Sequence, residues 1–204
     1  MIRFRLALDS DCERLSQLIN SAYRGESSRA GWTTEDHLIG GQRTDPASLR
    51  DLVAHDSAIL MAFEDEGAGG VADCSGASSD FGGGGRDGVT SSVAEAPVAG
   101  NLVGCVYLKN KKGHAYLGML TVSPGQQASG LGRNILAHAE SWAAKNWSVG
   151  RIELTVITRR TELIAWYVRC GYHETDRREP FPDDEKFGKP KVPDLELVAL
   201  EKRI

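Results

Sequence analysis

A short run of glycine and small polar residues at positions 127–132 has the composition of an anion-binding loop. Gln127, Gly130 and Gly132 are spaced as Gln-x-x-Gly-x-Gly and follow an apolar run that ends at Val122. The first N–H groups of a helix have no partner within the helix, and the helix dipole favours a negative charge beside them. Glycines remove the Cβ atoms that would hold a phosphate oxygen away from these amides. The segment therefore predicts a diphosphate site at the start of a helix.

Two other phosphate-binding loops are excluded by the residues that follow. A Walker loop needs Gly-Lys-Ser/Thr at its end, but Gly132 is followed by Arg133. A dinucleotide-binding fingerprint needs a third glycine three residues after Gly132, where the chain has Ile135. Taken alone, the hexapeptide is also compatible with a glycine-rich helix start that binds no ligand.

The elements that must position this loop can be read on both sides of it. Residues 116–122 are largely apolar and predict a strand that leads into the loop. Residues 151–157 alternate as in a second strand, and residues 161–170 predict a helix that ends at Gly171. Between the loop and the second strand, apolar residues fall on one helix face, namely Ile135, Leu136, Ala139, Trp142 and Ala143.

This order of elements resembles the acetyl-CoA-binding region of the GNAT superfamily of N-acetyltransferases. The family's loop pattern, Gln/Arg-x-x-Gly-x-Gly/Ala, matches residues 127–132, and the Val-x-Pro that often precedes it matches residues 122–124. The second family signature is a helix that ends in Tyr-x-x-x-Gly-Phe/Tyr, which matches Tyr167, Gly171 and Tyr172. Both signatures occur in the family's order and at its spacing.

The resemblance covers essentially the whole chain except residues 66–100. It implies an α/β (α+β) GNAT fold, in which a mixed central sheet of about seven strands, splayed in the middle, is flanked by about four or five helices. We therefore expect residues 1–204 to form a single N-acetyltransferase domain. Residues 66–100 are dominated by Gly, Ala and Ser and have little to bury, so we expect a flexible insertion in a hairpin turn.

Elements outside this region are predicted from periodicity and capping residues. Strands are expected at 2–8, 58–63, 102–108 and 195–201. Helices before residue 60 are expected to begin at the Ser10–Glu13 capping box, at Thr33 or Thr34, and at Asp45-Pro46. The charged, proline-punctuated stretch at 177–191 is interpreted as a loop.

The resemblance implies acetyl-CoA as the co-substrate, without a metal. The pantetheine arm would lie along the backbone of the strand before the loop, and the diphosphate would lie on the loop itself. The residues implied for cofactor binding are Leu120, Thr121, Val122, Gln127, Ala128, Ser129, Gly130, Leu131, Gly132 and Arg133.

Tyr167 matches the tyrosine with which many relatives protonate the departing CoA thiolate. A phenol with a pKa of about 10 suits this role at a site that excludes water. The alternative is a core aromatic on a helix face that also carries Ile164. The family's asparagine seven residues before the tyrosine is Arg160 here. Arg160 or Arg159 would meet a CoA phosphate or the substrate, unless it is an ordinary solvated arginine.

The sequence does not single out a general base. Gly118 and Tyr116 occupy strand positions where some relatives have histidines, so that option is absent. Glu35 and Glu153 are the candidate catalytic carboxylates, although each also suits an exposed position. A chain of water molecules with no single base is the other alternative.

Recognition of the acceptor is expected in the region between the first two helices. Tyr23, Arg24, Trp32 and Glu35 lie there, and residues 181–187 are expected to join them. Arg24 suits an acceptor that bears a carboxylate, such as an amino acid, whereas Glu35 suits a polyamine or an aminoglycoside. The sequence leaves both classes of acceptor open.

Bulk properties restrict the class of protein. The chain has 24 Lys and Arg against 28 Asp and Glu, a net charge of −4, which argues against nucleic acid or an anionic membrane as the main partner. No apolar run is long enough to span a membrane, and the start lacks the apolar core of a signal peptide, so we expect a cytoplasmic protein. The 4 cysteines and 5 histidines show no metal or disulfide spacing.

The leading hypothesis is direct transfer of an acetyl group from acetyl-CoA to a primary amine of a small molecule, such as an amino acid, a polyamine or an antibiotic-like amine. The alternatives are a protein lysine or N-terminal acetyltransferase and a non-catalytic acyl-CoA-binding module. The apolar tail at 195–200 is compatible with a homodimer and equally with an inner strand.

Overall fold

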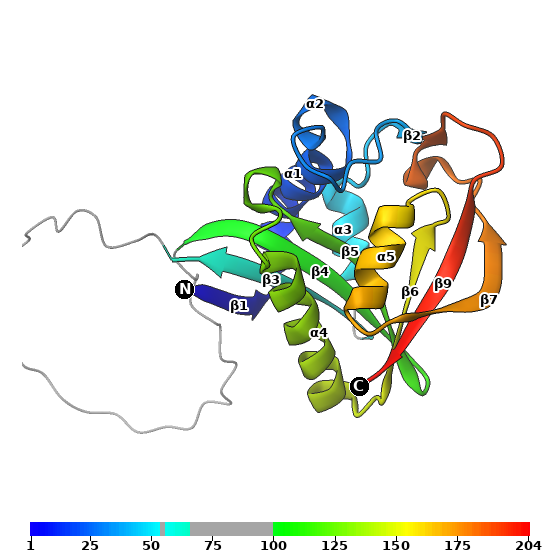
Figure 1. The fold of residues 1–204 in the computed structure, drawn as a ribbon. Helices are drawn as coiled ribbons and strands as arrows, with labels where there is room; N and C mark the ends of the chain where they lie inside the picture. Colours follow the sequence, from blue (N-terminus) through cyan, green and yellow to red (C-terminus); the bar gives the residue numbers. More distant parts are fainter. Residues whose placement is uncertain (54–55, 66–99) are drawn as a thin grey trace, which may run out of the picture.

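A computed structural model describes residues 1–53, 56–65 and 100–204 of the chain. Within these residues, seven strands form a sheet in the order β1-β3-β4-β5-β6-β9-β7 (Figure 1). They are β1 (Ile2–Leu6), β3 (Ser57–Glu64), β4 (Asn101–Lys111), β5 (His114–Val122), β6 (Arg151–Ile157), β7 (His173–Pro180) and β9 (Glu196–Arg203). The short strands β2 (Ile39–Gly40) and β8 (Lys189–Pro190) form a second sheet. The insertion expected at 66–100 lies outside the described residues except for residue 100.

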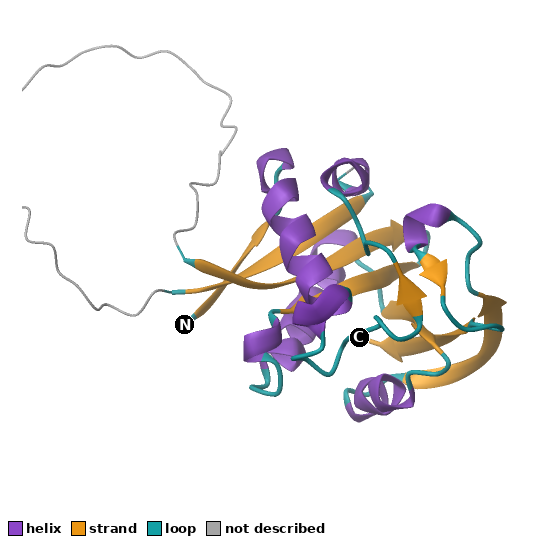
Figure 2. Ribbon diagram, turned by 90° about the horizontal axis from the view of Figure 1, so that it is seen from above, coloured by secondary structure: helices purple, strands orange, loops and turns teal. Residues whose placement is uncertain are grey.

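Helices lie on both faces of the large sheet (Figures 1 and 2). On one face are α1 (Cys12–Tyr23) and α3 (Pro46–Leu52), and on the other are α4 (Leu131–Trp147) and α5 (Thr161–Arg169). Strand β3 is covered by helices on both faces. Because alternate side chains of a strand point in opposite directions, they pack against different helices. Ile59 and Met61 pack with α1, whereas Leu60 and Ala62 pack with α4. The central strand predicted at 58–63 is therefore confirmed.

The sheet opens between β5 and β6, which are its one parallel pair among the described strands. Two residue pairs are in register, Ala115 with Ile152 and Tyr116 with Glu153. Beyond these two pairs, β5 and β6 diverge, and no other described strand lies between them. An irregularity in the β4–β5 pairing, with Met119 at a φ of 48°, bends β5 near this point. Open α/β sheets bind ligands in a crevice of this kind, at the carboxyl ends of their strands.

The helix expected to begin at Thr33 or Thr34 does not form, so this prediction was wrong. These residues form turns before β2, and a single helical turn, α2 (Gly25–Ser28), precedes them. Both threonine side chains are engaged in tertiary hydrogen bonds. Thr34 Oγ1 lies 2.7 Å from Ser28 Oγ, and Thr33 Oγ1 accepts a hydrogen bond from Gln127. Thr34 Oγ1 also accepts from the Asp36 N–H at 3.3 Å, as a helix cap would, but only turns follow before the chain enters β2 at Ile39.

The first helix begins at different residues from the predicted capping box. The backbone N–H of Leu8 donates to Asp11 Oδ2 at 2.8 Å, so Asp11 takes the role expected of Glu13. Arg5 donates two further hydrogen bonds to this carboxylate, at 2.6 and 2.7 Å. The hydrogen bonds from Arg5 lower the pKa of Asp11, and they connect the start of the helix to β1.

The C-terminal segment contains a strand where part of a loop was predicted. The loop expected at 177–191 overlaps β7, which runs from residue 173 to 180 at the edge of the sheet beside β9. Nearly all β7 side chains are exposed, so the segment lacks the apolar alternation of a half-buried strand. Strand β9 lies between β6 and β7, which makes the apolar tail an inner strand.

The described part of the chain contains no helix that is long and apolar enough to cross a membrane. Within the same residues, no group of three or more His, Cys, Asp and Glu side chains is arranged to hold a metal ion. Cys12, Cys105 and Cys170 are free thiols, and Cys74 lies outside the described residues.

Candidate active site

A cleft of about 760 Å³ lies where β5 and β6 separate. Its walls are the end of β5, the loop before α4, the length of α5 and the segment that follows α1. Its lining residues are Tyr23, Trp32, Thr33, Leu120, Val122, Gln127, Ala128, Gly130, Gly132, Arg133, Arg160, Glu162, Leu163, Ala165, Trp166, Tyr167 and Arg169. The cleft brings the predicted diphosphate loop together with Tyr167 and with part of the predicted acceptor region.

The predicted diphosphate loop forms the N-terminus of α4, a helix of 17 residues. Gly130 is the N-cap at a φ of 86°, and a Cβ there would meet no atom within 4 Å. The backbone angle, rather than lack of space, therefore requires glycine. A Cβ at Gly132 would touch Trp166 and Val122 at 3.6 Å, which is ordinary contact. The unpaired first-turn N–H groups carry the partial positive charge that favours a diphosphate, and Arg133 adds a full charge.

Gln127, the first residue of the loop pattern, uses its side chain to hold the opposite wall of the cleft. Its Oε1 accepts from the backbone N–H of Trp32 at 2.9 Å. Its Nε2 donates to Thr33 Oγ1 at 2.9 Å and to the Val122 carbonyl at 3.1 Å. A Cβ on Gly31 would lie 2.6 Å from Gln127 Oε1, so the two segments are in close contact. Gln127 thus ties the diphosphate loop to the predicted acceptor region.

Three of the residues predicted to bind the cofactor do not line the cleft. Thr121 is buried, and its Oγ1 donates to the Met119 carbonyl at 2.9 Å. Leu131, the first residue of α4, packs in the core, and Ser129 Oγ donates to the Gln126 carbonyl at 2.7 Å. For these three residues, a role in binding rests on the backbone alone. The lining residues among those predicted are Leu120, Val122, Gln127, Ala128, Gly130, Gly132 and Arg133.

Two buried tyrosines, Tyr167 on α5 and Tyr23 at the end of α1, line the same cleft. The Tyr23 hydroxyl donates to the Leu120 carbonyl at 2.7 Å, and burial raises the pKa of Tyr23 to about 12. The Tyr167 ring packs edge-on against Trp166 and Tyr172, and burial raises the pKa of Tyr167 well above its ordinary value. No described residue is a hydrogen-bond partner for the Tyr167 hydroxyl. This hydroxyl is therefore a neutral donor available to a ligand.

The Glu35 carboxylate is held between two arginines. Its Oε2 accepts from Arg24 at 2.7 Å and its Oε1 accepts from Arg160 at 2.9 Å, with all three side chains at most 10% exposed. Arg160 also donates to the Thr33 carbonyl at 2.8 Å, and Arg24 donates to the Phe187 carbonyl at 3.4 Å. Protonation of Glu35 would weaken both ion pairs. This arrangement favours an anchoring role for Glu35 over proton abstraction.

Glu153 does not line the cleft. Ile152 and Leu154, its neighbours on β6, pack with α4, so Glu153 points to the opposite face of the sheet. There it pairs with Arg177 at 2.7 Å, and His114 Nε2 lies 3.9 Å away. Burial acts to raise the pKa of Glu153, but the hydrogen bond and charge of Arg177 outweigh it, and the pKa is lowered. A carboxylate paired in this way is poorly suited to accept a proton.

Several residues that line the cleft were not identified from the sequence. Glu162, Leu163, Trp166 and Arg169 all come from α5. The helical period was the available signal, because residues three and four apart lie on one face. Trp166 also approaches Trp32 across the cleft, with ring centroids 6.2 Å apart, a contact that sequence spacing does not predict.

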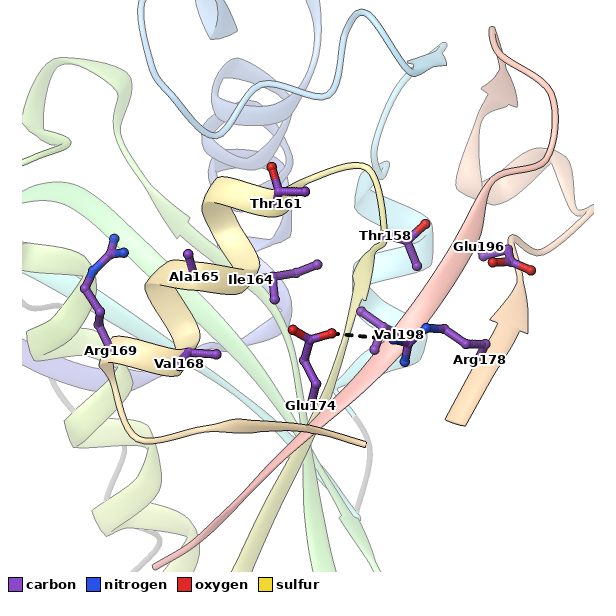
Figure 3. A pocket seen from close by; sticks show the side chains of 10 residues that line it. All are labelled: Thr158, Thr161, Ile164, Ala165, Val168, Arg169, Glu174, Arg178, Glu196 and Val198. Atoms are coloured by element: carbon purple, nitrogen blue, oxygen red, sulfur yellow. Dashed lines mark ion pairs between the residues drawn. The ribbon is translucent and has the colours of Figure 1, made fainter. Parts of the chain in front are cut away.

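A second cavity, of about 730 Å³, lies beside α5 toward β7 and β9 (Figure 3). It is lined by Thr158, Thr161, Ile164, Ala165, Val168, Arg169, Glu174, Arg178, Glu196 and Val198. Within it, Glu174 and Arg178 form an ion pair at 3.5 Å. Neither the loop before α4 nor Tyr167 contributes to this cavity, so it is separate from the chemistry of the cleft.

Comparison with known proteins gives a family for this arrangement. Residues 85–172 match the family described as Acetyltransferase (GNAT) family. The solved ribosomal-protein-S18-alanine N-acetyltransferase from Escherichia coli is similar, with a TM-score of 0.62 at 13% identity over 100% of this chain and 94% of that chain. Spermidine N-acetyltransferase from Vibrio cholerae, solved with CoA and spermine, has a TM-score of 0.60 at 12% identity over 99% of this chain and 95% of that chain. A comparison with curated protein sequences finds no match.

The family match covers the loop before α4, that helix, β6 and α5, which are the elements that build most of the cleft. The similarity to the solved structures extends over the whole sheet and its helices. Residues 85–172 therefore belong to the acetyltransferase (GNAT) family, and the chain shares the fold of the solved N-acetyltransferases.

Proposed function

We propose that the cleft binds acetyl-CoA and that the enzyme transfers the acetyl group directly to the primary amine of a small molecule. The observation that carries this proposal is the meeting of the α4 N-terminus and the unpartnered Tyr167 hydroxyl in one cleft. The loop at 127–133 would hold the diphosphate, with Arg133 adding a charge-assisted contact. The backbone of residues 120–122 would hold the pantetheine arm.

Transfer proceeds by attack of a neutral amine on the thioester carbonyl. The N–C bond forms and the C–S bond breaks. The departing thiolate takes the proton of the Tyr167 hydroxyl, and the proton released by the attacking nitrogen restores that hydroxyl through water. The raised pKa of Tyr167 keeps its hydroxyl protonated until the thiolate develops. The buried position of Tyr167 limits the access of water, which would otherwise compete for this step.

Replacement of Tyr167 by Phe tests the proposed acid. Because the variant keeps the ring and loses the donor, we expect kcat to fall by about 10²- to 10⁴-fold, with little change in acetyl-CoA affinity. Thiol release and isothermal titration calorimetry measure the two quantities. Tyr107→Phe is the matched control, since Tyr107 is also buried but does not line the cleft.

Unchanged turnover in Tyr167→Phe would remove Tyr167 as the acid. If the wild-type protein bound acetyl-CoA but released no thiol with any amine, the cleft would be a binding site without catalysis. Loss of acetyl-CoA affinity in the variant would instead give the hydroxyl a role in holding the cofactor.

A further inference from the structure

Positive charge exceeds negative charge around the inner end of the cleft. Arg24 and Arg160 share the single carboxylate of Glu35, at 2.7 and 2.9 Å. The guanidinium carbon of Arg43 lies 5.7 Å from the centroid of the Tyr23 ring, and no described carboxylate forms an ion pair with Arg43. Arg24 and Arg160 thus share one carboxylate, and Arg43 adds a third positive charge beside Tyr23, a residue that lines the cleft.

These cations are held where water compensates them poorly. The side chains of Arg24 and Arg160 are 5% and 8% exposed, and Arg24 Nε is buried without a hydrogen-bond partner among the described residues. An uncompensated charge in such surroundings costs free energy unless an anion binds beside it. The arrangement is therefore suited to a ligand that brings a negative charge.

The diphosphate of CoA does not supply that charge, because it belongs at the other end of α5. Arg133 donates to the Arg169 carbonyl at 3.4 Å near the C-terminus of α5, whereas Arg160 is the N-cap of the same helix. Nine residues of helix separate the two ends by about 13 Å, which is too far for a diphosphate beside Arg133 to contact Arg160. Glu162, the single acidic residue in the described lining of the cleft, is exposed to solvent, which screens its charge.

The position of Arg160 suits direct contact with a ligand. Arg160 and Tyr167 both line the cleft. Two hydrogen bonds, to Glu35 and to the Thr33 carbonyl, hold the guanidinium in place. A guanidinium has five N–H donors, so donors remain for an incoming anion. Arg24 does not line the cleft; it acts through Glu35, which it positions.

We infer that Arg160 binds a carboxylate of the acceptor, and that the substrates of this enzyme are amines that carry a carboxylate, such as α-amino acids. This inference rests on the proposed function. A planar guanidinium and a carboxylate form paired, charge-assisted hydrogen bonds. The same excess of positive charge disfavours a polyamine, because a cationic acceptor would enter against like charges.

Acceptors that differ in the carboxylate alone test the inference. Phenylalanine, phenylalaninamide and phenethylamine share a side chain, and the alanine and methionine sets extend the comparison to smaller and more flexible groups. Thiol release from acetyl-CoA gives kcat/KM for each acceptor. We expect the carboxylates to be preferred by about tenfold or more over both neutral analogues.

Replacement of Arg160 by Gln should remove this preference. We expect the ratio of kcat/KM for the carboxylates to kcat/KM for the neutral analogues to fall by about 10- to 100-fold. Arg159→Gln is the matched control, because Arg159 is exposed, donates to the Pro193 carbonyl and does not line the cleft. If Arg160→Gln unfolds, Arg43→Gln removes a charge of the same sign without breaking the Glu35 ion pairs.

Several outcomes would overturn the inference. Equal use of neutral analogues and carboxylates by the wild type would do so, and so would normal acetyl-CoA binding with no turnover of any carboxylate-bearing amine. A parallel assay with succinyl-CoA separates the two sources of a carboxylate. A preference for succinyl-CoA that is lost in Arg160→Gln would assign Arg160 to the acyl group instead. Failure to bind acetyl-CoA at all would overturn the proposed function rather than this inference.

Discussion

Gly130 shows how a single backbone angle couples helix formation to ligand binding. The residue is the N-cap of α4 at a φ of 86°, and it places the following N–H groups at the start of the helix. A residue with a Cβ is strained at this angle by roughly 1–2 kcal/mol. The strain acts at the point where the diphosphate is proposed to bind.

We expect Gly130→Ala to lower the free energy of unfolding by about 1 kcal/mol and to weaken acetyl-CoA binding, because relief of the strain shifts the first-turn amides. Urea denaturation and titration calorimetry measure the two effects. Gly125→Ala is the control, since neither residue has an atom within 4 Å of the added Cβ and Gly125 has no positive φ. Equal behaviour of the two variants would contradict the argument.

The two glutamates considered as bases lead to a prediction about pH. Glu35 is held by two arginines, and Glu153 pairs with Arg177 away from the cleft, so we expect water to accept the proton of the acceptor. The value of kcat/KM should then rise with pH, with an apparent pKa that follows the amine of the acceptor. Profiles for acceptors of different amine pKa measure this. One apparent pKa shared by all acceptors would instead indicate a base on the enzyme.

At the scale of elements, Gln127 makes the loop before α4 and the segment after α1 one unit. Its three hydrogen bonds, to Trp32, Thr33 and Val122, join parts of the chain that are far apart in sequence. We expect Gln127→Ala to release the Trp32 segment, because the shorter side chain reaches none of these partners. The KM for the acceptor should rise several-fold, with a smaller effect on the affinity for acetyl-CoA.

Hydrogen exchange of the Trp32 amide provides a direct readout, since its acceptor is lost in that variant. Gln126→Ala is the matched control, because the Gln126 side chain bonds Glu64 and not the Trp32 segment. An unchanged exchange rate in Gln127→Ala would show that other contacts hold the segment.

The elements that could be predicted are those whose signal is local. The strand at 116–122, the loop and α4 carry their own periodicity and glycine spacing, and α3 begins as expected with Asp45 accepting from the Ser48 N–H at 2.9 Å. The helix expected at Thr33 or Thr34 does not form, although Thr34 Oγ1 accepts from the Asp36 N–H, because the chain enters β2 at Ile39 and pairs there with β8. The family resemblance implied a seventh strand, but the bounds of β7 could not be predicted because an exposed edge strand has no buried face to produce a pattern.

At the scale of the whole molecule, the family and the fold class predicted from the sequence are confirmed. The arrangement of the charges could not be predicted in the same way. Arg24, Glu35 and Arg160 come from separate parts of the chain, and their ion pairs exist only once the segment after α1 has packed against the start of α5. The sequence identified Arg24 and Glu35 as alternative guides to the acceptor, whereas the fold joins them as partners in one cluster.

The gap between β5 and β6 divides the central sheet into two parts, which are joined by a short region where these two strands pair. Two residue pairs in register make up that paired region, and the backbone groups on the facing edges beyond it have no partner among the described strands. The pantetheine arm carries amides of its own, so the bound cofactor would form hydrogen bonds with the unpaired strand edges of both parts of the sheet. CoA, bound as proposed, would then stabilise the sheet as well as react, and its departure in each catalytic cycle would leave the two facing edges unpaired.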